Sequence, residues 1–507
     1  MRNFYQRHHH PIRASIRFIT YFSGFFLALL AYWVGDNFGE PSLEQVLYHL
    51  QFGMDGLVDT DTALIRSFVM WCLLLPLLCS VLLVVIEYSI AMFIVHGSEH
   101  WITRPARLGN IRVLKGLYWT INHRAPIYFL MFGFVYFAMQ FSLSAYIHHR
   151  LGQDYFSMHY VDPHGVKVTP VKPKNLVLIY VESLENSYQK PTLFDKNLLT
   201  SLDQFKGLTF SDFRQAPGTG WTIAGMIATQ CGIPLKSVSL YDGNGVGENI
   251  KTFLPNAICL GDILHAAGYY NVYMGGDALN FSGKGKFYRE HHYQEVYGKD
   301  ELRGNLKDSE LNYWGLYDDD LLAAAKQKLK QLHQSGQRFN FTISTIDTHG
   351  PDGHYSRYCV KNGVNNFPKI VECTANQVAQ LVQFIKQSGM INDTQIVITG
   401  DHLAMENPVY DTVEKNQQRR IYNQFISRQK FDKNRDQILH FDMYPTILSF
   451  IGFSIEHNKL GLGFNALSES TEIPPEHQFE EMDKDLLNQS ERYLQLWDPN
   501  YRPDTMM

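Results

Sequence analysis

Acidic and histidine residues follow four apolar segments of the sequence, at the points where those segments end. Glu182 follows NLVLIYV, Asp347-Thr348-His349 follow FNFTISTI, and Asp401-His402 follow QIVIT and a glycine. A fourth segment, YNVYM, runs into Gly275-Gly276-Asp277. A single carboxylate after a strand is often only a helix N-cap, but carboxylates and imidazoles together suit Zn²⁺, Mn²⁺ or Mg²⁺. If the segment ends meet, the sequence predicts a site for one divalent metal ion.

These four segments are predicted to be strands of one sheet. Strands are expected at 175–181, 270–274, 339–346 and 395–399, and helices at 222–229, 260–267, 319–334, 374–388 and 443–451. Continuous apolar strands that alternate with helices indicate an α/β domain with a mostly parallel central sheet covered by helices on both faces. In such sheets ligands bind beyond the carboxyl ends of the strands, which is where the acidic and histidine residues lie.

A glycine-flanked threonine, Thr219, supplies the nucleophile that such a metal site needs. It lies in PGTGWTIAGM (217–226), which leads directly into an apolar helical segment. A helix N-terminus offers free N–H groups and a positive dipole, so it favours an anionic phosphate or sulfate. A threonine hydroxyl is a weak nucleophile unless metal coordination lowers its pKa. Taken alone, Thr219 would be a plain N-cap, so its interpretation depends on the metal ligands.

Three long apolar runs lie within the first 150 residues. They cover about 18–35, 67–95 and 127–147, and each reaches the ~20 residues that a helix needs to cross ~30 Å of hydrocarbon. Core helices of a soluble domain are the alternative, but apolar runs of this length are rare in soluble cores. We therefore expect residues 1–150 to form a three-span transmembrane anchor in the lipid bilayer.

Charges beside these runs predict their orientation. Residues 1–17 carry four arginines and no acid, whereas 36–61 carry six acids and no lysine or arginine. Residues 97–125 carry five basic residues and one acid. Because positively charged loops stay in the cytoplasm, the N-terminus is predicted to be cytoplasmic and everything after residue 147 to lie outside.

Composition limits the class of function. The chain has 507 residues and a formal net charge of −5, which argues against a nucleic-acid binder that works through a basic face. Residues 151–173 are interpreted as a polar connector, 174–466 as the catalytic domain, and 467–507 as a solvated acidic C-terminal extension.

Four cysteines lie in the predicted exterior part, namely Cys231, Cys259, Cys359 and Cys373. An even number outside the cytoplasm indicates two disulfides. Four cysteines allow three connectivities, and pairing by proximity in the sequence predicts Cys231–Cys259 and Cys359–Cys373.

Several stretches resemble the alkaline phosphatase/sulfatase superfamily, and more narrowly the phosphoglycerol transferase I family, to which lipoteichoic acid synthases are related. They include YVESLE (180–185), PGTGWTIAGM (217–226), ATQCGIPL (228–235), YWGLYDDDLL (313–322), DTHGPDG (347–353) and GDHLAM (400–405). The resemblance covers about 174–465. It implies a multi-pass enzyme of the Gram-negative inner membrane with a periplasmic catalytic domain. Such an enzyme moves phosphoglycerol from phosphatidylglycerol to a periplasmic glucan, lipopolysaccharide or another glycan, and releases diacylglycerol.

The resemblance also implies roles for single residues. One divalent metal ion would be held by Glu182, Thr219, Asp401 and His402. Thr219 would also be the nucleophile that forms a covalent intermediate; Thr222 is its rival, and the spacing to Met226 favours Thr219. His349 would contact the phosphoryl group or assist proton transfer. Substrate contacts are expected from Trp221, Asp277, Lys284 and Lys286.

Other functions of the same fold are the alternatives. One is a phosphoethanolamine transferase or phosphodiesterase, and another is a non-catalytic envelope factor. By the same resemblance, a phosphoethanolamine transferase would carry a further histidine some residues beyond its Asp-His pair. No histidine follows His402 before His440, which favours phosphoglycerol transfer.

Overall fold

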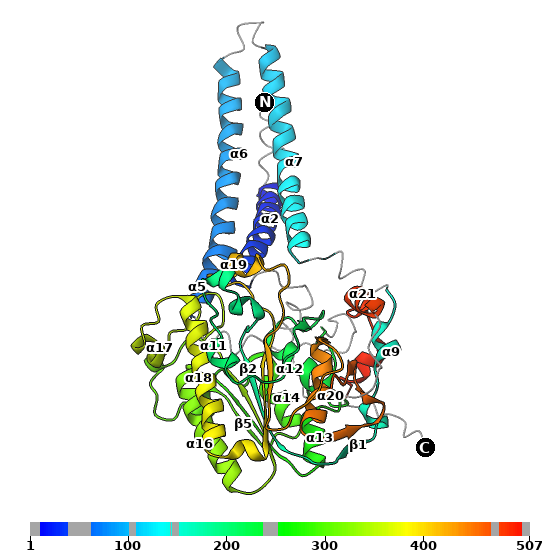
Figure 1. The fold of residues 1–507 in the computed structure, drawn as a ribbon. Coiled ribbons are helices and arrows are strands. Elements are labelled where there is room, and N and C mark those ends of the chain that lie inside the picture. The colour runs from blue at the N-terminus through cyan, green and yellow to red at the C-terminus, as the bar shows by residue number, and fades with distance from the viewer. Residues whose placement is uncertain are drawn as a thin grey trace. The chain divides into compact units, whose positions relative to one another are not determined.

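The computed structural model describes residues 11–38, 62–100, 108–141, 143, 152–236, 252–467 and 476–498. The chain forms two compact units, a group of N-terminal helices and a C-terminal α/β domain (Figure 1). Each unit is described by itself.

The N-terminal unit is built from long apolar helices. Its elements are α2 (Pro11–Phe38), α5 (Thr62–Phe68), the π-helix η1 (Val69–Leu74), α6 (Leu75–His100) and α7 (Leu108–Gln140). Among the described residues, two stretches are long and apolar enough to cross a membrane, Ile12–Asn37 and Leu64–Ile90. Within the described residues, the prediction of three spans is therefore corrected to two candidate spans. The described apolar part of the third run lies between Arg124 and Gln140 on α7, which is shorter than the ~20 residues of a span, and residues 144–147 lie outside the described part.

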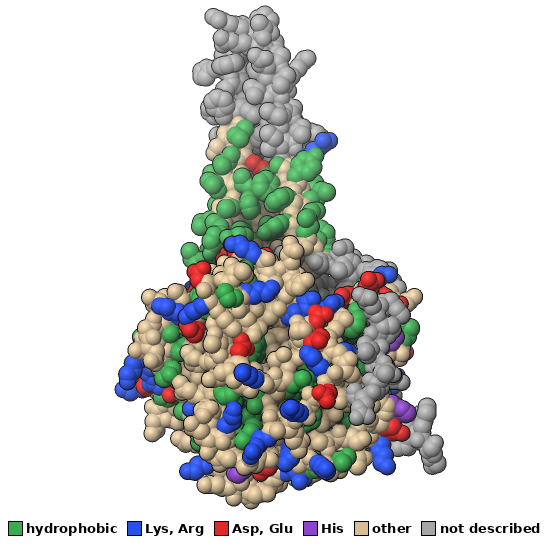
Figure 2. Space-filling model, viewed as in Figure 1, with side chains coloured by type: hydrophobic (Ala, Val, Ile, Leu, Met, Phe, Trp, Pro, Cys, Tyr) green, Lys and Arg blue, Asp and Glu red, His purple; other side chains and the backbone are tan. Residues whose placement is uncertain are grey.

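Two glycines bring α7 close to α2. A Cβ on Gly133 would lie 2.1 Å from the carbonyl oxygen of Gly24, so small residues permit this approach. Large apolar side chains point outward instead, and Figure 2 shows hydrophobic side chains over the coloured part of these helices. They include Met70, Leu78, Leu82, Phe132 and Met139, each more than half exposed. Water disfavours so large an apolar surface, so the helices form an apolar membrane anchor.

A six-stranded sheet forms the centre of the C-terminal domain. Its strand order is β5-β4-β6-β2-β7-β8. The β7–β8 pair is antiparallel and the other four pairs are parallel, which confirms a mostly parallel sheet. The strands are β2 (Asn175–Val181), β4 (Tyr270–Gly275), β5 (Glu295–Tyr297), β6 (Phe339–Ser344), β7 (Thr394–Gly400) and β8 (Asn423–Ile426).

Alternate side chains of β2 point into two separate cores. Leu178 and Tyr180 pack in the core that contains α12, α13 and α20, whereas Val177 and Ile179 pack in the core that contains α16 and α18. Both faces of the sheet are therefore covered by helices, as Figure 1 shows. These helices are α12 (Thr222–Cys231), α13 (Leu260–Ala266), α16 (Asp318–Gln334), α18 (Phe367–Gln387) and α20 (His440–Phe450). The predicted strands and helices are confirmed, apart from shifts at their ends.

The parallel register brings the predicted ligand positions to one edge. Val181 pairs with Gly400, and Ser344 pairs with both Tyr180 and Gly275. Because β4, β6, β2 and β7 are neighbours in that order, the loops that follow them leave the sheet at the same edge.

The segment predicted as a polar connector is part of the folded domain. It contains α9 (Tyr155–His159), whose Tyr155 and Phe156 are buried. It also contains β1 (Val168–Pro170), which pairs with β10 (Phe453–Ile455). The segment folds onto the domain because its aromatic side chains pack into the hydrophobic core.

The described part of the C-terminal extension also packs onto the domain, so its prediction as a solvated tail was wrong. Helices α21 (Glu476–Asp485) and α22 (Glu491–Gln495) join the core that contains α12, because apolar residues interrupt the acidic ones. The buried residues are Phe479, Met482, Leu486, Tyr493, Leu496 and Trp497.

Both predicted disulfides are present. Cys231–Cys259 joins the end of α12 to the residue before α13, and Cys359–Cys373 joins α17 to α18. Shorter elements complete the described domain: α10 (Pro191–Phe194), α11 (Thr200–Asp203), β3 (Asp212–Arg214), α14 (Lys284–Glu290), α15 (Lys299–Leu302), α17 (Arg357–Lys361), α19 (Tyr410–Glu414), β9 (Gln437–Leu439), β11 (Lys459–Leu460) and β12 (Gly463–Phe464).

Candidate active site

Glu182, Asp401 and His402 come together at the carboxyl edge of the sheet. Glu182 follows β2, and the other two follow the neighbouring strand β7. Their ligand atoms lie within 4.8 Å of one another and all three side chains are buried. Nε2 of His402 is 3.4 Å from Oε1 of Glu182 and 3.5 Å from Oδ2 of Asp401. The structure thus unites three of the four residues that the sequence proposed as metal ligands.

The threonine beside this cluster is Thr222. Its hydroxyl donates to Oε2 of Glu182 at 3.2 Å, and it is the first residue of α12. The hydroxyl of Thr219 donates instead to the carbonyl oxygen of Ala216 at 2.6 Å, and this side chain is fully buried. The geometry therefore favours Thr222 over Thr219 as the threonine that faces the predicted ligands. Spacing along the sequence favours Thr219 because it does not report which of the two hydroxyls reaches Glu182, a residue distant in the chain.

Helix α12 lies directly against the backbone of Asp401. A Cβ on Gly225 would stand 2.0 Å from the carbonyl oxygen of Asp401, so only a glycine permits this approach. Nε2 of His440, the first residue of α20, donates to the same carbonyl oxygen at 2.8 Å. These contacts fix the helix that begins at Thr222 relative to Asp401.

Ser183 orients both carboxylates, and the sequence analysis missed it. Its backbone N–H donates to Oδ1 of Asp401 at 2.9 Å, and its hydroxyl donates to Oε1 of Glu182 at 2.6 Å. Its φ of 54° lies in the left-handed region, which a non-glycine residue adopts at some cost and which recurs at functional sites. The one signal for Ser183 in the sequence is its place next to Glu182.

A hydrogen bond to the backbone orients the ring of His402, the third predicted metal ligand. Nδ1 of His402 donates to the carbonyl oxygen of Leu403 at 2.8 Å. In the neutral ring this hydrogen bond leaves the lone pair on Nε2, the atom that faces the carboxylates, as is typical of metal-binding histidines.

The hydroxyl of Thr348 donates to the carbonyl oxygen of Glu182 at 2.6 Å and so ties the loop after β6 to the loop after β2.

The pKa values within the cluster indicate that its buried carboxylates are stabilised by a neighbouring positive charge. Burial, together with the charge of Glu182, raises the pKa of Asp401 to about 7. Burial lowers the pKa of His402, but the charges of Asp401 and Glu182 outweigh this and raise it to about 10. Burial also acts to raise the pKa of Glu182, yet the charge of His402 holds it below its usual range. A divalent cation supplies the charge that the His402 proton otherwise provides, so this donor set fits one.

His349 lies beside the cluster rather than within it. Nδ1 of its ring donates to the carbonyl oxygen of Gly350 at 2.6 Å. The ring packs against Trp314 with 4.4 Å between centroids, and its charge contributes to the lowered pKa of Glu182. Because Nδ1 is engaged, Nε2 is the ring atom that can exchange a proton with a substrate.

The residues expected to contact substrate occupy different places. Asp277 and Lys284 form a buried ion pair after β4. Burial lowers the pKa of Lys284, but the charge of Asp277 outweighs burial and raises the pKa above its usual range. Lys286 is exposed on α14, and Trp221 is buried as the N-cap residue of α12.

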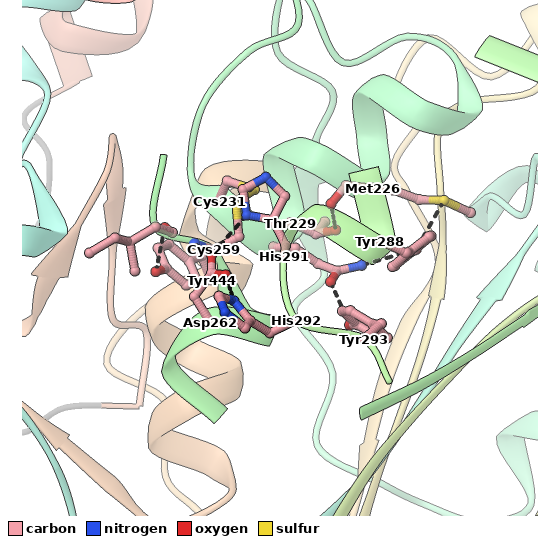
Figure 3. Close-up of a disulfide and its surroundings, with 12 residues drawn as sticks. Met226, Thr229, Cys231, Cys259, Asp262, Tyr288, His291, His292, Tyr293 and Tyr444 are labelled. Carbon is pink, nitrogen blue, oxygen red and sulfur yellow. Dashed lines mark hydrogen bonds and ion pairs between the residues drawn. A yellow bond between two sulfur atoms is a disulfide. The ribbon is translucent and has the colours of Figure 1, made fainter. Parts of the chain in front are cut away.

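A second group of metal-binding residue types is not a metal site. Cys259, Asp262 and His291 lie close together, but Cys259 is bonded to Cys231. Figure 3 shows Asp262 accepting hydrogen bonds from His291 and His292 beside this disulfide, both at 2.8 Å. Asp262 also accepts from the backbone N–H of Cys259 at 2.7 Å, so its role is to fix the start of α13.

The chain is similar to several known proteins. Residues 174–453 match the sulfatase family. Phosphoglycerol transferase I of Salmonella choleraesuis is 39% identical over 333 residues, which are 63% of this chain and 42% of the relative. The protein of the same name from Salmonella arizonae gives the same values. The chain thus matches about two fifths of the length of these curated relatives. An alkaline phosphatase superfamily protein from Vibrio parahaemolyticus has a TM-score of 0.46 at 18% identity, over 65% of this chain and 79% of that one.

Proposed function

Because the chain belongs to the sulfatase family, we propose that it is a membrane-anchored phosphoglycerol transferase that uses Thr222 as its nucleophile. The donor is phosphatidylglycerol, and the acceptor is a glycan of the periplasm. The observation that carries the proposal is the hydrogen bond from Thr222 to Glu182 in a buried cluster with Asp401 and His402. Identity to phosphoglycerol transferase I supports the choice of phosphoglycerol. The apolar anchor supports a lipid donor, and the two disulfides support an exterior catalytic domain.

The proposed metal ligands are Glu182, Thr222, Asp401 and His402, with Zn²⁺, Mn²⁺ or Mg²⁺ as the ion. When bound there, the ion lowers the pKa of the Thr222 hydroxyl and neutralises charge on the phosphoryl oxygens. The side chains themselves are already held by Ser183, which donates to both carboxylates, and by Leu403, which accepts from His402.

The chemistry proceeds in two balanced steps. In the first step Oγ1 of Thr222 loses its proton and attacks phosphorus, so a Thr222–phosphorus bond forms and the bond from phosphorus to the diacylglycerol oxygen breaks. Diacylglycerol takes up a proton and leaves. In the second step an acceptor hydroxyl attacks phosphorus and loses its proton, and Thr222 is released with its hydroxyl restored. His349 is proposed to carry these protons, because it lies beside the cluster and follows the neighbouring strand β6.

The helix that begins at Thr222 also favours this substrate. α12 has ten residues, and its N-terminus lies at the cluster. The positive end of its dipole therefore faces the position where the phosphodiester must sit. An anionic headgroup suits this position better than a neutral one.

The test compares Thr222→Ala with Thr219→Ala in the full-length, detergent-solubilised protein. Phosphatidylglycerol labelled in its acyl chains is the donor, and the release of diacylglycerol is measured. We expect Thr222→Ala to lower the rate at least about 100-fold, as loss of a nucleophile does. Thr219→Ala should keep most of the rate, because that hydroxyl contacts only its own loop through Ala216. Mass spectrometry should find phosphoglycerol on the peptide that contains Thr222.

Two results would contradict the proposal. Unchanged diacylglycerol release in Thr222→Ala would remove the nucleophile. A faster release from phosphatidylethanolamine than from phosphatidylglycerol would replace the proposed donor and indicate a phosphoethanolamine transferase.

A further inference from the structure

An aromatic surface borders the candidate active site next to His349. We call it the aromatic rim and define it by Tyr313, Trp314 and Phe281. The Trp314 ring packs on His349 with 4.4 Å between centroids, and on Phe281 with 5.1 Å. The neighbouring Tyr313 is 59% exposed. Its ring meets that of His354 edge to face at 6.4 Å, so the rim joins two histidines of the loop that follows β6.

The loop that carries Tyr313 and Trp314 is held in one conformation. Oδ1 of Asn312 accepts from the backbone N–H groups of Trp314 and Gly315, both at 2.8 Å. The backbone N–H of Leu316 donates to the carbonyl oxygen of Gly276 at 2.8 Å. A Cβ on Gly315 would lie 2.0 Å from the same oxygen. The rim is thus fixed to the end of β4, and a large exposed ring on a rigid support is preorganised for binding.

The loop that follows β6 and carries His354 is also held in place, at the end where it joins α17. Arg357 forms ion pairs with Glu310 at 2.7 Å and with Asp320 at 2.6 Å. The disulfide of Cys359 follows two residues later. This loop presents a further exposed ring, Tyr355, which is 39% exposed and follows His354 in the chain.

His354 supplies a polar group beside these rings. Its side chain is 9% exposed, and Nε2 has no hydrogen-bond partner in the part of the chain that the structure describes. Buried polar atoms are nearly always paired in native proteins. Nε2 is itself buried, and the His354 ring lies against the exposed Tyr313 ring, so a ligand that displaces Tyr313 would supply the missing partner.

We infer that the aromatic rim is an acceptor subsite that binds a sugar ring and presents one of its hydroxyls next to His349. This inference rests on the proposed phosphoglycerol transfer and names the acceptor side of that site. A pyranose has C–H groups on its faces and hydroxyls around its edge. Aromatic rings bind the faces, and an adjacent polar atom such as Nε2 of His354 binds the edge. An acyl chain has no hydroxyl that could pair with Nε2 of His354, so it matches the rim less well than a sugar does.

The experiment separates the two half-reactions in the full-length protein. The donor is labelled phosphatidylglycerol, and the acceptor is a set of linear glucose oligomers with α-1,4, β-1,2, β-1,3 and β-1,4 linkages. Tyr313→Ala should raise the oligomer concentration for half-maximal transfer about tenfold, which corresponds to the loss of one aromatic contact. Diacylglycerol release without an acceptor should stay within about twofold of the original rate, because the ring of Tyr313 packs on His354, which is not one of the proposed metal ligands. Tyr313→Phe should retain transfer, since the ring remains.

Tyr358→Ala is the matched control. Tyr358 is also an exposed tyrosine, at 37%, but its hydroxyl accepts a hydrogen bond from Gln380 of α18. Its removal should leave transfer unchanged. Binding of the oligomers is measured separately by saturation-transfer NMR, a readout that does not depend on activity.

Three results would overturn the inference. Oligomer binding that is equal in Tyr313→Ala and the original protein overturns it, as does the lack of binding by the original protein. An equal loss of diacylglycerol release and transfer overturns it too, because the rim would then serve the lipid donor. If the original protein binds oligomers through Tyr313 but releases no diacylglycerol, the subsite stands and the proposed function fails.

Discussion

Gly225→Ala tests whether the approach of α12 to Asp401 positions the candidate active site. The added Cβ would stand 2.0 Å from the carbonyl oxygen of Asp401 and 2.9 Å from its carbonyl carbon. Real Cβ atoms essentially never come closer than 3.0 Å to another heavy atom. The start of α12 and the end of β7 must therefore separate by at least about 1 Å. Both groups are backbone, so no flexible side chain can absorb the change.

The expected loss of activity is larger than the expected loss of stability. Overpacking costs about 1–3 kcal/mol, but alanine is favoured over glycine inside a helix by about 1 kcal/mol. The free energy of unfolding should thus fall by roughly 0–2 kcal/mol. Thr222 lies three residues before Gly225 and moves with the helix, away from Glu182 and Asp401. A displacement of about 1 Å in a catalytic group can lower a rate about 100-fold.

Three measurements separate these effects: diacylglycerol release from labelled phosphatidylglycerol, metal content by plasma mass spectrometry, and the thermal unfolding midpoint. Gly165→Ala is the control, because a Cβ at Gly165 meets no atom within 4 Å. We expect Gly225→Ala to stay folded but to lose both rate and bound metal. If it matched Gly165→Ala in both, the contact between α12 and Asp401 would not be what positions the site.

Replacing Cys231 and Cys259 by serine should lower the free energy of unfolding by about 3–4 kcal/mol in a denaturant titration, since the bond closes a separation of 28 residues; an unchanged midpoint would contradict this. Burial lowers the pKa of Lys236 to about 7, whereas an unfolded lysine has a pKa of about 10.4. At pH values between these two, the unfolded state binds more protons than the folded state, so the free energy of unfolding rises with pH. Lys236→Met should therefore raise the unfolding midpoint more at pH 6 than at pH 9, and an equal gain at both would refute the shift. Mn²⁺ or Zn²⁺ at about 100 times its dissociation constant should stabilise the protein by about 2.7 kcal/mol in scanning fluorimetry, whereas Asp401→Asn should abolish the effect; an unaltered response of the variant would place the ion elsewhere.

The ligand positions could be predicted from the sequence because each rests on a single strand and its direction. β2 and β7 are continuous apolar runs, so their ends are visible at Glu182 and Asp401. Parallel pairing then requires those ends to meet. The two disulfides were predictable for a similar reason, since both partners are close in the sequence.

The choice between two threonines could not be made in this way. Thr219 and Thr222 lie in one glycine-rich segment, and the predicted start of the helix at 222 does not show which hydroxyl reaches Glu182, because Glu182 follows a strand distant in the chain. The contacts of Ser183 and Gly225 with Asp401 join residues far apart in the chain. No local pattern reports such contacts, because they arise only when the strands and helices pack.

The C-terminal helices show how composition can mislead. Acidic residues dominate the sequence around α21, so its overall composition is polar. This composition obscures Phe479, Met482 and Leu486, which recur at helical spacing. A stripe this narrow stabilises a helix only when a core is present to receive it. That core includes residues of α9 and α12, which belong to distant parts of the chain, so the sequence of the segment alone could not reveal it.

The electrostatics of the cluster argue against the alternative of a non-catalytic envelope factor. Glu182, Asp401 and His402 are all buried, and burial raises the pKa of Asp401 to about 7. Replacing a buried charged group of this kind by packed apolar residues is often neutral or stabilising. A domain kept only for its shape gains nothing from two buried carboxylates, nor from the left-handed backbone of Ser183 that orients them. Their retention is explained if the cluster binds a cation and positions Thr222 for attack, because this task needs uncompensated negative charge at a fixed place.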